Sequence, residues 1–331
     1  MILTTYQKVA SSKAPLLLRN PHLQTLYATL FRKERLVGYV EELFTLEDGD
    51  VVECVWYPHK PKEKEPVAVL FHGLEGSIDS PYIVGMMKEL ARRGYVSVLM
   101  QFRGCGREPN RKPRAYHSGD TADAKAWISH LHRLYPDTPL YAAGFSIGGN
   151  VLLKLLGEWG SDAPIRAAAA VSVPMRLDIS AMTLEHGFAR IYQRHLLTSL
   201  KKNLLEKYRR FDIASITGVS ASQIEKVRTI REFDAAYTAP VHGFTSVDDY
   251  YTRASSRQYL KGITVPTLVI HALDDPFMTP KVLPQDSELS KSVSLEVYQH
   301  GGHVGFVTGS LRRPRYWLEE RIGMFFSSWH L

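Results

Sequence analysis

The chain has 331 residues, of which 44% are hydrophobic, and 41 Lys and Arg against 34 Asp and Glu give a net charge of +7. This length and composition can bury a large core, and α/β folds often run to this length as one domain. No apolar run approaches the ~18 residues of a membrane span, and the first 35 residues lack the apolar region and cleavage site of a signal peptide. Two cysteines, Cys54 and Cys105, are too few for a disulfide scaffold and favour a reducing compartment. We therefore predict one domain, residues 1–331, located in the cytoplasm without stable membrane insertion.

Basic residues are denser in two stretches, residues 107–114 and residues 201–210. Neither stretch is interleaved with base-stacking aromatic residues or lies in a nucleic-acid-binding motif, so we predict no nucleic-acid partner. We interpret both stretches as solvated surface, and weak attraction to anionic lipid is the alternative interpretation. The sequence leaves the oligomeric state open.

The predicted elements, in chain order, describe one sheet with helices between its strands. Residues 40–46 and 51–56 predict a hairpin around an Asp-Gly-Asp turn. Apolar runs then predict strands at 67–71, 95–102, 140–143, 167–173, 265–270 and 293–298. Helical patterns at 82–93, 121–134 and 150–156 follow the earlier strands. Such alternation predicts the α/β class, with a mostly parallel central sheet and helices on both faces.

Residues 144–148 (Gly-Phe-Ser-Ile-Gly) lie between a predicted strand and a predicted helix, and they carry the strongest functional signal. In that context G-x-S-x-G is the nucleophile elbow of an α/β-hydrolase fold. A strand that turns into a helix within one residue brings neighbouring backbone together, and the two glycines remove the Cβ atoms that would collide. Ser146 is thereby presented at a helix N-terminus, where free N–H groups favour developing negative charge. We predict that Ser146 is a catalytic nucleophile.

A serine nucleophile needs a base and an orienting carboxylate, which follow it in this fold in the order Asp or Glu, then His. Asp274 and Asp275 come just after the predicted strand 265–270, and His300 and His303 come just after strand 293–298. The carboxyl ends of parallel strands share one edge of the sheet, so both groups are expected near Ser146. We predict that His303 exchanges a proton with the serine while an Asp fixes its tautomer.

Adjacent Asp274 and Asp275 cannot both face the histidine. The pattern strand-H-G-x-x-D-P, common at this place in the fold, aligns Ala272 with its glycine and makes Asp275 the triad member. Asp274 is then a loop or cap residue. His303 is preferred over His300 because two glycines give a close-packed turn before it.

An oxyanion hole is expected at the His-Gly turn that follows strand 67–71. The backbone N–H groups of Leu74 and Ile147 are the predicted donors, and such donors typically contribute about 3 kcal/mol each. Glu75, beside this loop, is interpreted as a member of a loop salt bridge. His117 with Asp120 and Asp123 matches no common zinc spacing, so we predict neither a metal nor a cofactor.

The alternation of strands and helices stops between Pro174 and Leu260. Apolar residues recur there near helical spacing, at Phe188, Ile191, Tyr192, Leu196 and Leu200. We predict a helical cap insertion, residues 175–260, that rests over the active site, excludes water and lines an acyl pocket. Ordinary packing is the alternative for any one of these residues.

Several of these segments resemble the YheT-type esterases of bacteria, relatives of the eukaryotic ABHD-type lipid esterases. The resemblance rests on residues 71–77, 102–105, 116–120, 144–150 and 301–306, with further support from 20–25 and 228–234. It covers nearly the whole chain. It implies an α/β-hydrolase fold, carboxylic-ester hydrolysis and a charge relay that falls on Ser146, Asp275 and His303.

We therefore expect a serine hydrolase that cleaves small carboxylic esters, with short- to medium-chain or lipid-like acyl groups, through an acyl-enzyme on Ser146. Acyl transfer or thioester hydrolysis by the same triad is the alternative within enzymes. A non-catalytic binding module is the alternative from another class, and the complete set of Ser, Asp and His argues against it.

Overall fold

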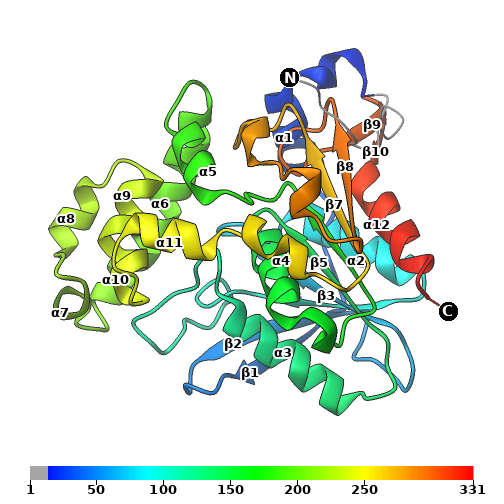
Figure 1. The fold of residues 1–331 in the computed structure, drawn as a ribbon, viewed down its shortest axis with the longest axis horizontal. Helices are drawn as coiled ribbons and strands as arrows, with labels where there is room; N and C mark the ends of the chain where they lie inside the picture. The colour runs from blue at the N-terminus through cyan, green and yellow to red at the C-terminus, as the bar shows by residue number, and fades with distance from the viewer. Residues whose placement is uncertain (1–13, 331) are drawn as a thin grey trace.

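The computed structural model describes residues 14–330, and Figure 1 shows how its elements are arranged. The strands are β1 (Val40–Thr45), β2 (Val51–Tyr57), β3 (Val67–Phe71), β4 (Val96–Met100), β5 (Leu140–Phe145), β6 (Ala167–Val171), β7 (Thr267–Ala272), β8 (Val293–Tyr298), β9 (Val307–Ser310) and β10 (Arg313–Tyr316). The first eight form one sheet in the order β1-β2-β4-β3-β5-β6-β7-β8, and β9 and β10 form a separate hairpin. The pairs β1–β2 and β2–β4 are antiparallel and the other pairs of the large sheet are parallel. The predicted α/β class with a mostly parallel sheet is confirmed.

Helices cover both faces of this sheet, as the alternation predicts. The helices outside the β6–β7 connection are α1 (Pro21–Phe31), α2 (Pro81–Arg92), α3 (Thr121–Leu134), α4 (Ile147–Trp159) and α12 (Trp317–Ser327), with short 3₁₀ turns η1 (Leu16–Arg19), η2 (Gly160–Asp162), η5 (Pro280–Val282) and η6 (Asp286–Glu288). Residues of α3 and α4 share one apolar cluster, and residues of α2 and α12 share another. Alternate β5 side chains divide between the two clusters, because successive residues of a strand point to opposite faces.

The sequence patterns located most of these elements but missed both ends of the chain. Helix α1 has a sequence signal in Asn20-Pro21: the Asn20 side chain accepts hydrogen bonds from the N–H groups of His22 and Leu23, and proline occupies the first helical position. Helix α12 and the β9–β10 hairpin were likewise not predicted. These additions matter for function because α1 contacts the loop that carries His303.

The connection between β6 and β7 is helical, and Figure 1 shows most of it gathered to one side of the sheet. It contains α5 (Leu177–Leu184), α6 (Ala189–Tyr208), α7 (Ile213–Thr217), α8 (Ala221–Lys226), α9 (Ile230–Phe233), a π-helical turn η3 (Asp234–Thr238), α10 (Ala239–Val241), α11 (Val247–Ala254) and the 3₁₀ turn η4 (Arg257–Gly262). It builds apolar clusters of its own around Leu204, Ile213 and Tyr250. We call residues 177–262 the helical segment.

Two details of the helical segment differ from expectation. Phe188 and Ile191 belong to the predicted apolar stripe of α6, yet 47% and 57% of their surfaces are exposed. Lys207, which the sequence assigns to a solvated basic stretch, is 8% exposed. Its Nζ contacts the Asn110 side chain and donates to the carbonyl oxygens of Lys112 and Arg114, and burial lowers its pKa to about 8.

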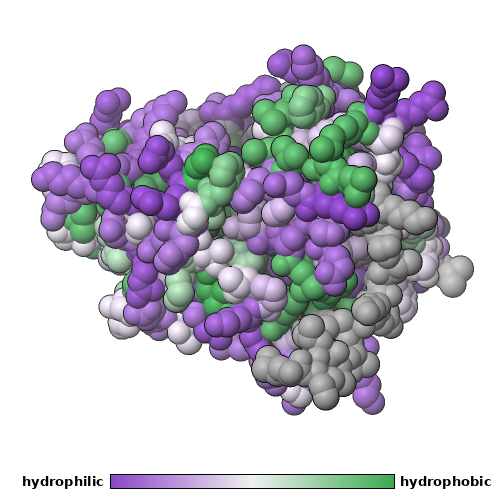
Figure 2. All heavy atoms as spheres, turned by 90° about the horizontal axis from the view of Figure 1, so that it is seen from above, coloured by the Kyte–Doolittle hydropathy of each residue, from purple (hydrophilic) through white to green (hydrophobic). Residues whose placement is uncertain are grey.

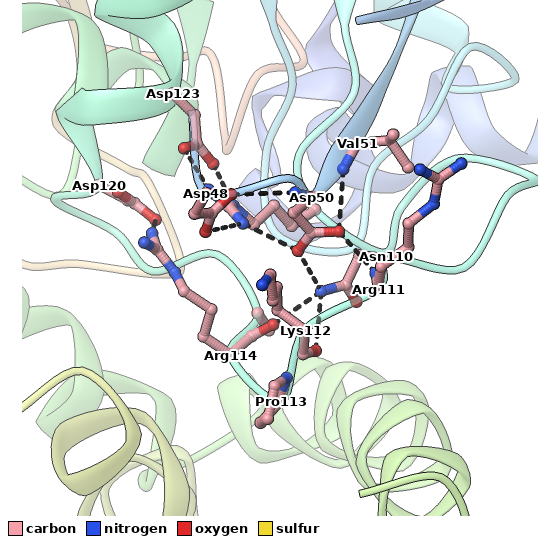
Figure 3. Close-up of polar contacts among 12 residues, drawn as sticks. Asp48, Asp50, Val51, Asn110, Arg111, Lys112, Pro113, Arg114, Asp120 and Asp123 are labelled. Atoms are coloured by element: carbon pink, nitrogen blue, oxygen red, sulfur yellow. Dashed lines mark hydrogen bonds and ion pairs between the residues drawn. The ribbon is translucent and has the colours of Figure 1, made fainter. Parts of the chain in front are cut away.

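A buried polar network joins the loop 110–114 to Asp48 and Asp50 of the β1–β2 turn (Figure 3). The Arg103 guanidinium donates to Asp123 at 2.5 and 2.7 Å and to Asp48 and Asp50 at 2.8 Å each. Asn110 donates to Asp50 at 2.9 Å and so joins the loop to this cluster. The loop that receives Lys207 is therefore fixed by the sheet side of the molecule.

Within residues 14–330, no helix is long and apolar enough to cross a membrane.

Candidate active site

Ser146 lies at the tight turn between β5 and α4. Its backbone has φ 53° and ψ −122°, a conformation that residues other than glycine rarely adopt. A Cβ on Gly148 would stand 2.4 Å from the carbonyl oxygen of His72, so the helix could not approach β3 with any other residue there. The local sequence thus sets the strained turn that the elbow motif predicts, and α4 begins at the residue after the serine.

The structure brings Ser146, His303 and Asp275 together. The Ser146 Oγ and His303 Nε2 atoms are 3.0 Å apart, and His303 Nδ1 lies 2.9 Å from Asp275 Oδ2. The Asp275 side chain is fully buried, and 9% of the His303 side chain is exposed. A carboxylate in this position requires a proton on Nδ1, which leaves Nε2 as the acceptor that faces the serine hydroxyl.

Asp274 and His300 take a different place. Asp274 Oδ1 accepts hydrogen bonds from the N–H groups of Gly301 and Gly302, each at 2.9 Å, and Asp274 Oδ2 lies 3.2 Å from His300 Nδ1. Neither Asp274 nor His300 contacts Ser146. The adjacent carboxylates therefore diverge, with Asp274 shaping the turn before His303 and Asp275 meeting the ring itself.

The His303 loop is held by residues that sequence reasoning did not single out for a role. Thr25 Oγ1 accepts from the His303 N–H at 2.9 Å, and Gln24 exchanges two hydrogen bonds with the backbone of Val307. The Phe277 ring stacks on the imidazole of His303 at 4.0 Å with an interplanar angle of 2°. The run 20–25 supported the resemblance, but only the fold shows that α1 reaches the histidine loop.

The loop after β3 passes beside the serine. A Cβ on Gly73 would stand 3.3 Å from the Ser146 Cβ. The N–H groups on both sides of Leu74 are engaged: Gly73 donates to the Tyr82 hydroxyl at 2.9 Å, and Glu75 donates to the Tyr116 hydroxyl at 3.0 Å. The Leu74 N–H has no hydrogen-bond partner within the described part of the chain, and Ile147 N–H is at the first position of α4, where a helix leaves its donors free.

Glu75 does not form the predicted salt bridge, because no cation pairs with it among residues 14–330. Its Oε2 accepts from Ser199 Oγ at 2.5 Å and from Asn203 Nδ2 at 2.7 Å, and its Oε1 accepts from the Tyr116 hydroxyl at 3.0 Å. Both Ser199 and Asn203 belong to α6. The carboxylate therefore links the loop that carries Leu74 to the helical segment, and Glu75 itself has a left-handed φ of 54°.

The His72 ring joins the loop after β3 to the backbone of Phe102. Its ring is fully buried, and burial lowers its pKa to about 4, so the ring is neutral at ordinary pH. Nε2 accepts from the Phe102 N–H at 3.1 Å, which leaves Nδ1 to donate to the Gly73 carbonyl at 2.7 Å. His72 therefore has a supporting position and does not face Ser146.

One group of side chains has the composition of a metal site. His117, Asp120 and His242 present ligand atoms within 4.8 Å of one another. Both ring nitrogens of His242 face backbone carbonyls, His117 Nδ1 accepts from the Gly119 N–H, and Asp120 pairs with Arg114. These atoms already have partners, so the group fits a hydrogen-bonded turn better than a set of ligands.

A small cavity of about 90 Å³ begins at Leu74 and lies between the sheet side and the helical segment. Its wall is mostly apolar and includes Leu200, Leu204, Ile230, Phe233 and Tyr237. Asp234, on the π-helical turn, also lines it, and burial raises the pKa of that carboxyl to about 6. Of the stripe predicted for α6, Leu200 reaches this cavity.

Comparison with known proteins agrees with this architecture. Residues 66–310 match the family model described as the alpha/beta hydrolase fold. The chain is 43% identical to "Putative esterase YheT" of Escherichia coli (strain K12) over 92% of this chain and 89% of that protein. It is 32% identical to Phospholipase ABHD3 of Mus musculus, over 91% of this chain and 74% of that protein. Among solved structures, Pyrococcus furiosus esterase Pf2001 superimposes with a TM-score of 0.59 at 18% identity, over 90% and 97% of the two chains.

The chain belongs to the α/β-hydrolase family. Within that family it groups with the carboxylic-ester hydrolases, and the resemblance to the YheT-type esterases is confirmed.

Proposed function

We propose that the protein hydrolyses carboxylic esters through an acyl-enzyme formed on Ser146, with His303 as general base and acid and Asp275 as its orienting carboxylate. The observation that carries the proposal is the continuous hydrogen-bonded series from Ser146 Oγ through His303 to Asp275. Family membership supports the reaction class, and the geometry supports these three residues.

The reaction begins when Ser146 Oγ attacks the ester carbonyl carbon and its proton passes to His303 Nε2. The buried Asp275 carboxylate stabilises the imidazolium that forms. His303 then returns the proton to the alkoxide as the C–O bond breaks, and the alcohol leaves. A water molecule, deprotonated by His303, attacks the acyl-enzyme, and the carboxylic acid is released as Ser146 regains its proton. These steps need no metal or cofactor.

The tetrahedral oxyanion is assigned to the N–H groups of Leu74 and Ile147. Two observations support this assignment. Neither N–H group has another hydrogen-bond partner in the described chain, and the loop that carries Leu74 lies beside Ser146. Fixed donors aimed at a developing negative charge are worth about 3 kcal/mol each.

The helical segment acts in this proposal as a cap, corresponding to the predicted insertion 175–260. The apolar cavity at Leu74 is assigned to the acyl chain. A volume of about 90 Å³ equals that of about three water molecules in the liquid, so it admits a short chain. Each buried methylene contributes ~0.8 kcal/mol, so efficiency should rise from acetate to butyrate or hexanoate esters and then stop rising. Bulky triglycerides should be poor substrates.

A cytoplasmic location is part of the same proposal. Cys54 and Cys105 are both free, which supports a reducing compartment and hence the cytoplasm. Burial raises the pKa of the Cys105 thiol well above its usual range, which disfavours its use as a nucleophile.

The test combines a fluorophosphonate probe with a series of p-nitrophenyl esters of increasing chain length. We expect the probe to label the wild type and not Ser146→Ala. Labelling elsewhere, or none in a folded wild type, would overturn the proposal. A steady fall in kcat/KM from acetate upward would remove the acyl-pocket assignment while leaving the triad in place. Added alcohol that diverts the product from acid to ester would indicate acyl transfer.

A further inference from the structure

A row of cations that form no ion pair within the described residues lies along the outer face of α6. A groove of about 900 Å³ runs along this helix, and the cations that line it are Arg190, Arg194, Lys201, Lys202, Arg209 and Arg228. Glu206 is the one carboxylate among its lining residues. Within residues 14–330 none of the six cations forms an ion pair, whereas most arginines on the sheet side do.

The exposed residues of α6 recur every three or four positions, which places them on the same face of the helix. The exposed positions of α6 are 190, 191, 194, 195, 198, 202 and 206, which fall on one side of the helix, and the exposed Arg209 follows its last residue. The opposite side buries Tyr192, Leu197 and Leu204. Helix α6 thus points Arg190, Arg194 and Lys202 to solvent from one face, while the half-buried Lys201 contacts the backbone carbonyls of Glu225 and Val227.

Exposed apolar side chains lie at the N-terminal end of the same helix. Met182, Phe188 and Ile191 expose 63%, 47% and 57% of their surfaces. Met182 and Phe188 line a shallow depression of about 450 Å³ that also includes His22 of α1. Figure 2 looks down on the side of the molecule that carries α1 and α5, and hydrophobic residues gather there beside strongly hydrophilic ones.

This apolar end is connected to the candidate active site by a series of rings. Phe188 contacts His22 at 4.1 Å between ring centroids, and the His22 ring lies 3.1 Å from the Tyr192 hydroxyl. Tyr192 in turn contacts Phe277 at 4.9 Å, and Phe277 stacks on His303. Phe188 is therefore the outer end of a series of ring contacts whose inner end is the imidazole of His303.

We propose that this face of α6, with Met182 and Phe188, docks the protein on an anionic lipid bilayer. Unpaired cations match anionic headgroups, and exposed apolar side chains match the headgroup–acyl boundary into which interfacial helices insert. A soluble polyanion would use the cations but gain nothing from Met182, Phe188 or Ile191, so the combination favours a membrane. The proposal rests on the proposed function in one respect: docking would bring the face of the molecule that holds Phe188, and with it the candidate active site, to ester substrates held in the membrane.

The test measures co-sedimentation with phosphatidylcholine vesicles that do or do not contain phosphatidylglycerol. The Ser146→Ala background prevents turnover from altering the vesicles. Three charge reversals, Arg190→Glu, Arg194→Glu and Lys202→Glu, are combined in one variant. The matched control reverses Lys125, Arg133 and Lys261, exposed cations of α3 and η4 that also form no ion pair within the described residues. Both variants change the net charge by the same amount.

We expect the parent to bind phosphatidylglycerol vesicles and the α6 variant to bind on the order of 100-fold more weakly at low salt, since each basic residue near an anionic surface contributes about fivefold. Added salt should weaken vesicle binding by the parent until it approaches the binding of the α6 variant, because salt screens the attraction between charges. The control variant should bind within a few-fold of the parent. A variant with both Ile191→Ser and Met182→Ser should bind vesicles more weakly even at high salt. Salt screens the attraction between charges, but it does not screen the insertion of apolar side chains into the bilayer.

Equal losses in the two charge-reversal variants would overturn the proposal in favour of net charge alone. Binding to a short single-stranded DNA without binding to vesicles would overturn it in favour of a soluble polyanion. Turnover of p-nitrophenyl butyrate by the α6 variant in the wild-type background is measured in parallel. Unchanged turnover with lost vesicle binding separates docking from catalysis, and absent turnover in the wild type would count against the proposed function and not against docking.

Discussion

The carboxyl edge of the sheet and the helical segment hold their polar groups in different ways. At the sheet edge, Ser146 follows β5, whose residues are all buried, and its backbone N–H donates to the Val171 carbonyl. In the His303 loop, backbone N–H groups donate to the side chains of Thr25 and Ser172. The helical segment meets that edge through polar side chains: the half-buried Ser199 donates to Glu75, and the buried Lys207 donates to the loop 110–114. A rigid edge can hold reacting atoms in place, whereas polar contacts let a separate helical layer set the position of one loop. The following predictions test this division.

The largest effect is expected at the sheet edge itself. Ser146→Ala should lower kcat by about 10⁴ or more, as removal of a triad member does in serine proteases, while thermal stability changes little. The measurement is ester turnover together with a thermal melt. Turnover that persists in a folded Ser146→Ala protein would assign the nucleophile to another residue.

The two adjacent carboxylates at the same edge should differ strongly. Asp275→Asn should lower kcat by about 10⁴, because an amide no longer selects the histidine tautomer. Asp274→Asn keeps an oxygen for the Gly301 and Gly302 N–H groups, so the loss should be about tenfold or less. The measurement is kcat for ester hydrolysis by each variant, compared with the wild type. If the larger loss follows Asp274, the assignment after β7 is wrong by one residue.

The link between the two regions is tested at Glu75. Glu75→Ala removes the acceptor for Ser199, Asn203 and Tyr116, so the Leu74 N–H should lose its fixed position. We expect kcat to fall on the order of 100-fold with KM little changed, since an oxyanion donor acts mainly in the transition state.

Ser199→Ala provides the second side of a double-mutant cycle. If α6 acts through Glu75, the Ser199→Ala loss should nearly disappear in the Glu75→Ala background. Additive losses would mean that the two residues act separately, and the helical segment would then have no influence on the oxyanion loop by this route.

The smallest effect is expected inside the helical segment. Burial raises the pKa of Asp234 to about 6 from the usual 3.8, against the opposing influence of Tyr251, Thr238 and Arg231. Between pH 3.8 and about 6 the folded protein holds a proton that the unfolded chain has lost, so stability falls as pH rises through this window. Above it, the buried charge destabilises the fold in full.

Asp234→Asn should therefore raise the free energy of unfolding at pH 8 by at most about 3 kcal/mol, measured as a higher melting temperature, and should change it little near pH 4. The amide still accepts from the Tyr251 hydroxyl, so the variant tests charge and not the hydrogen bond. An equal shift at both pH values would show that Asp234 is not the titrating group.

The sequence by itself determined the sheet and the position of each triad candidate along the chain. Alternating strands and helices predict the α/β class, and the elbow glycines are required wherever a strand turns into a helix within one residue. The choice of Asp275 over Asp274 followed from a local pattern, and the geometry agrees with it. These inferences are local, because each depends on residues a few positions apart.

Only the tertiary structure decided which distant residues support these groups. Thr25 meets the His303 N–H across 278 positions, Glu75 reaches Ser199 across 124, and Lys207 reaches the loop 110–114 across about 95. A single sequence carries no signal for such pairs, since hydrogen-bonding side chains of the same types occur throughout the surface. The interpretation of Glu75 as a salt bridge and of Lys207 as solvated failed for this reason. Their environment is set by how α6 packs on the sheet, and packing is a property of the whole fold.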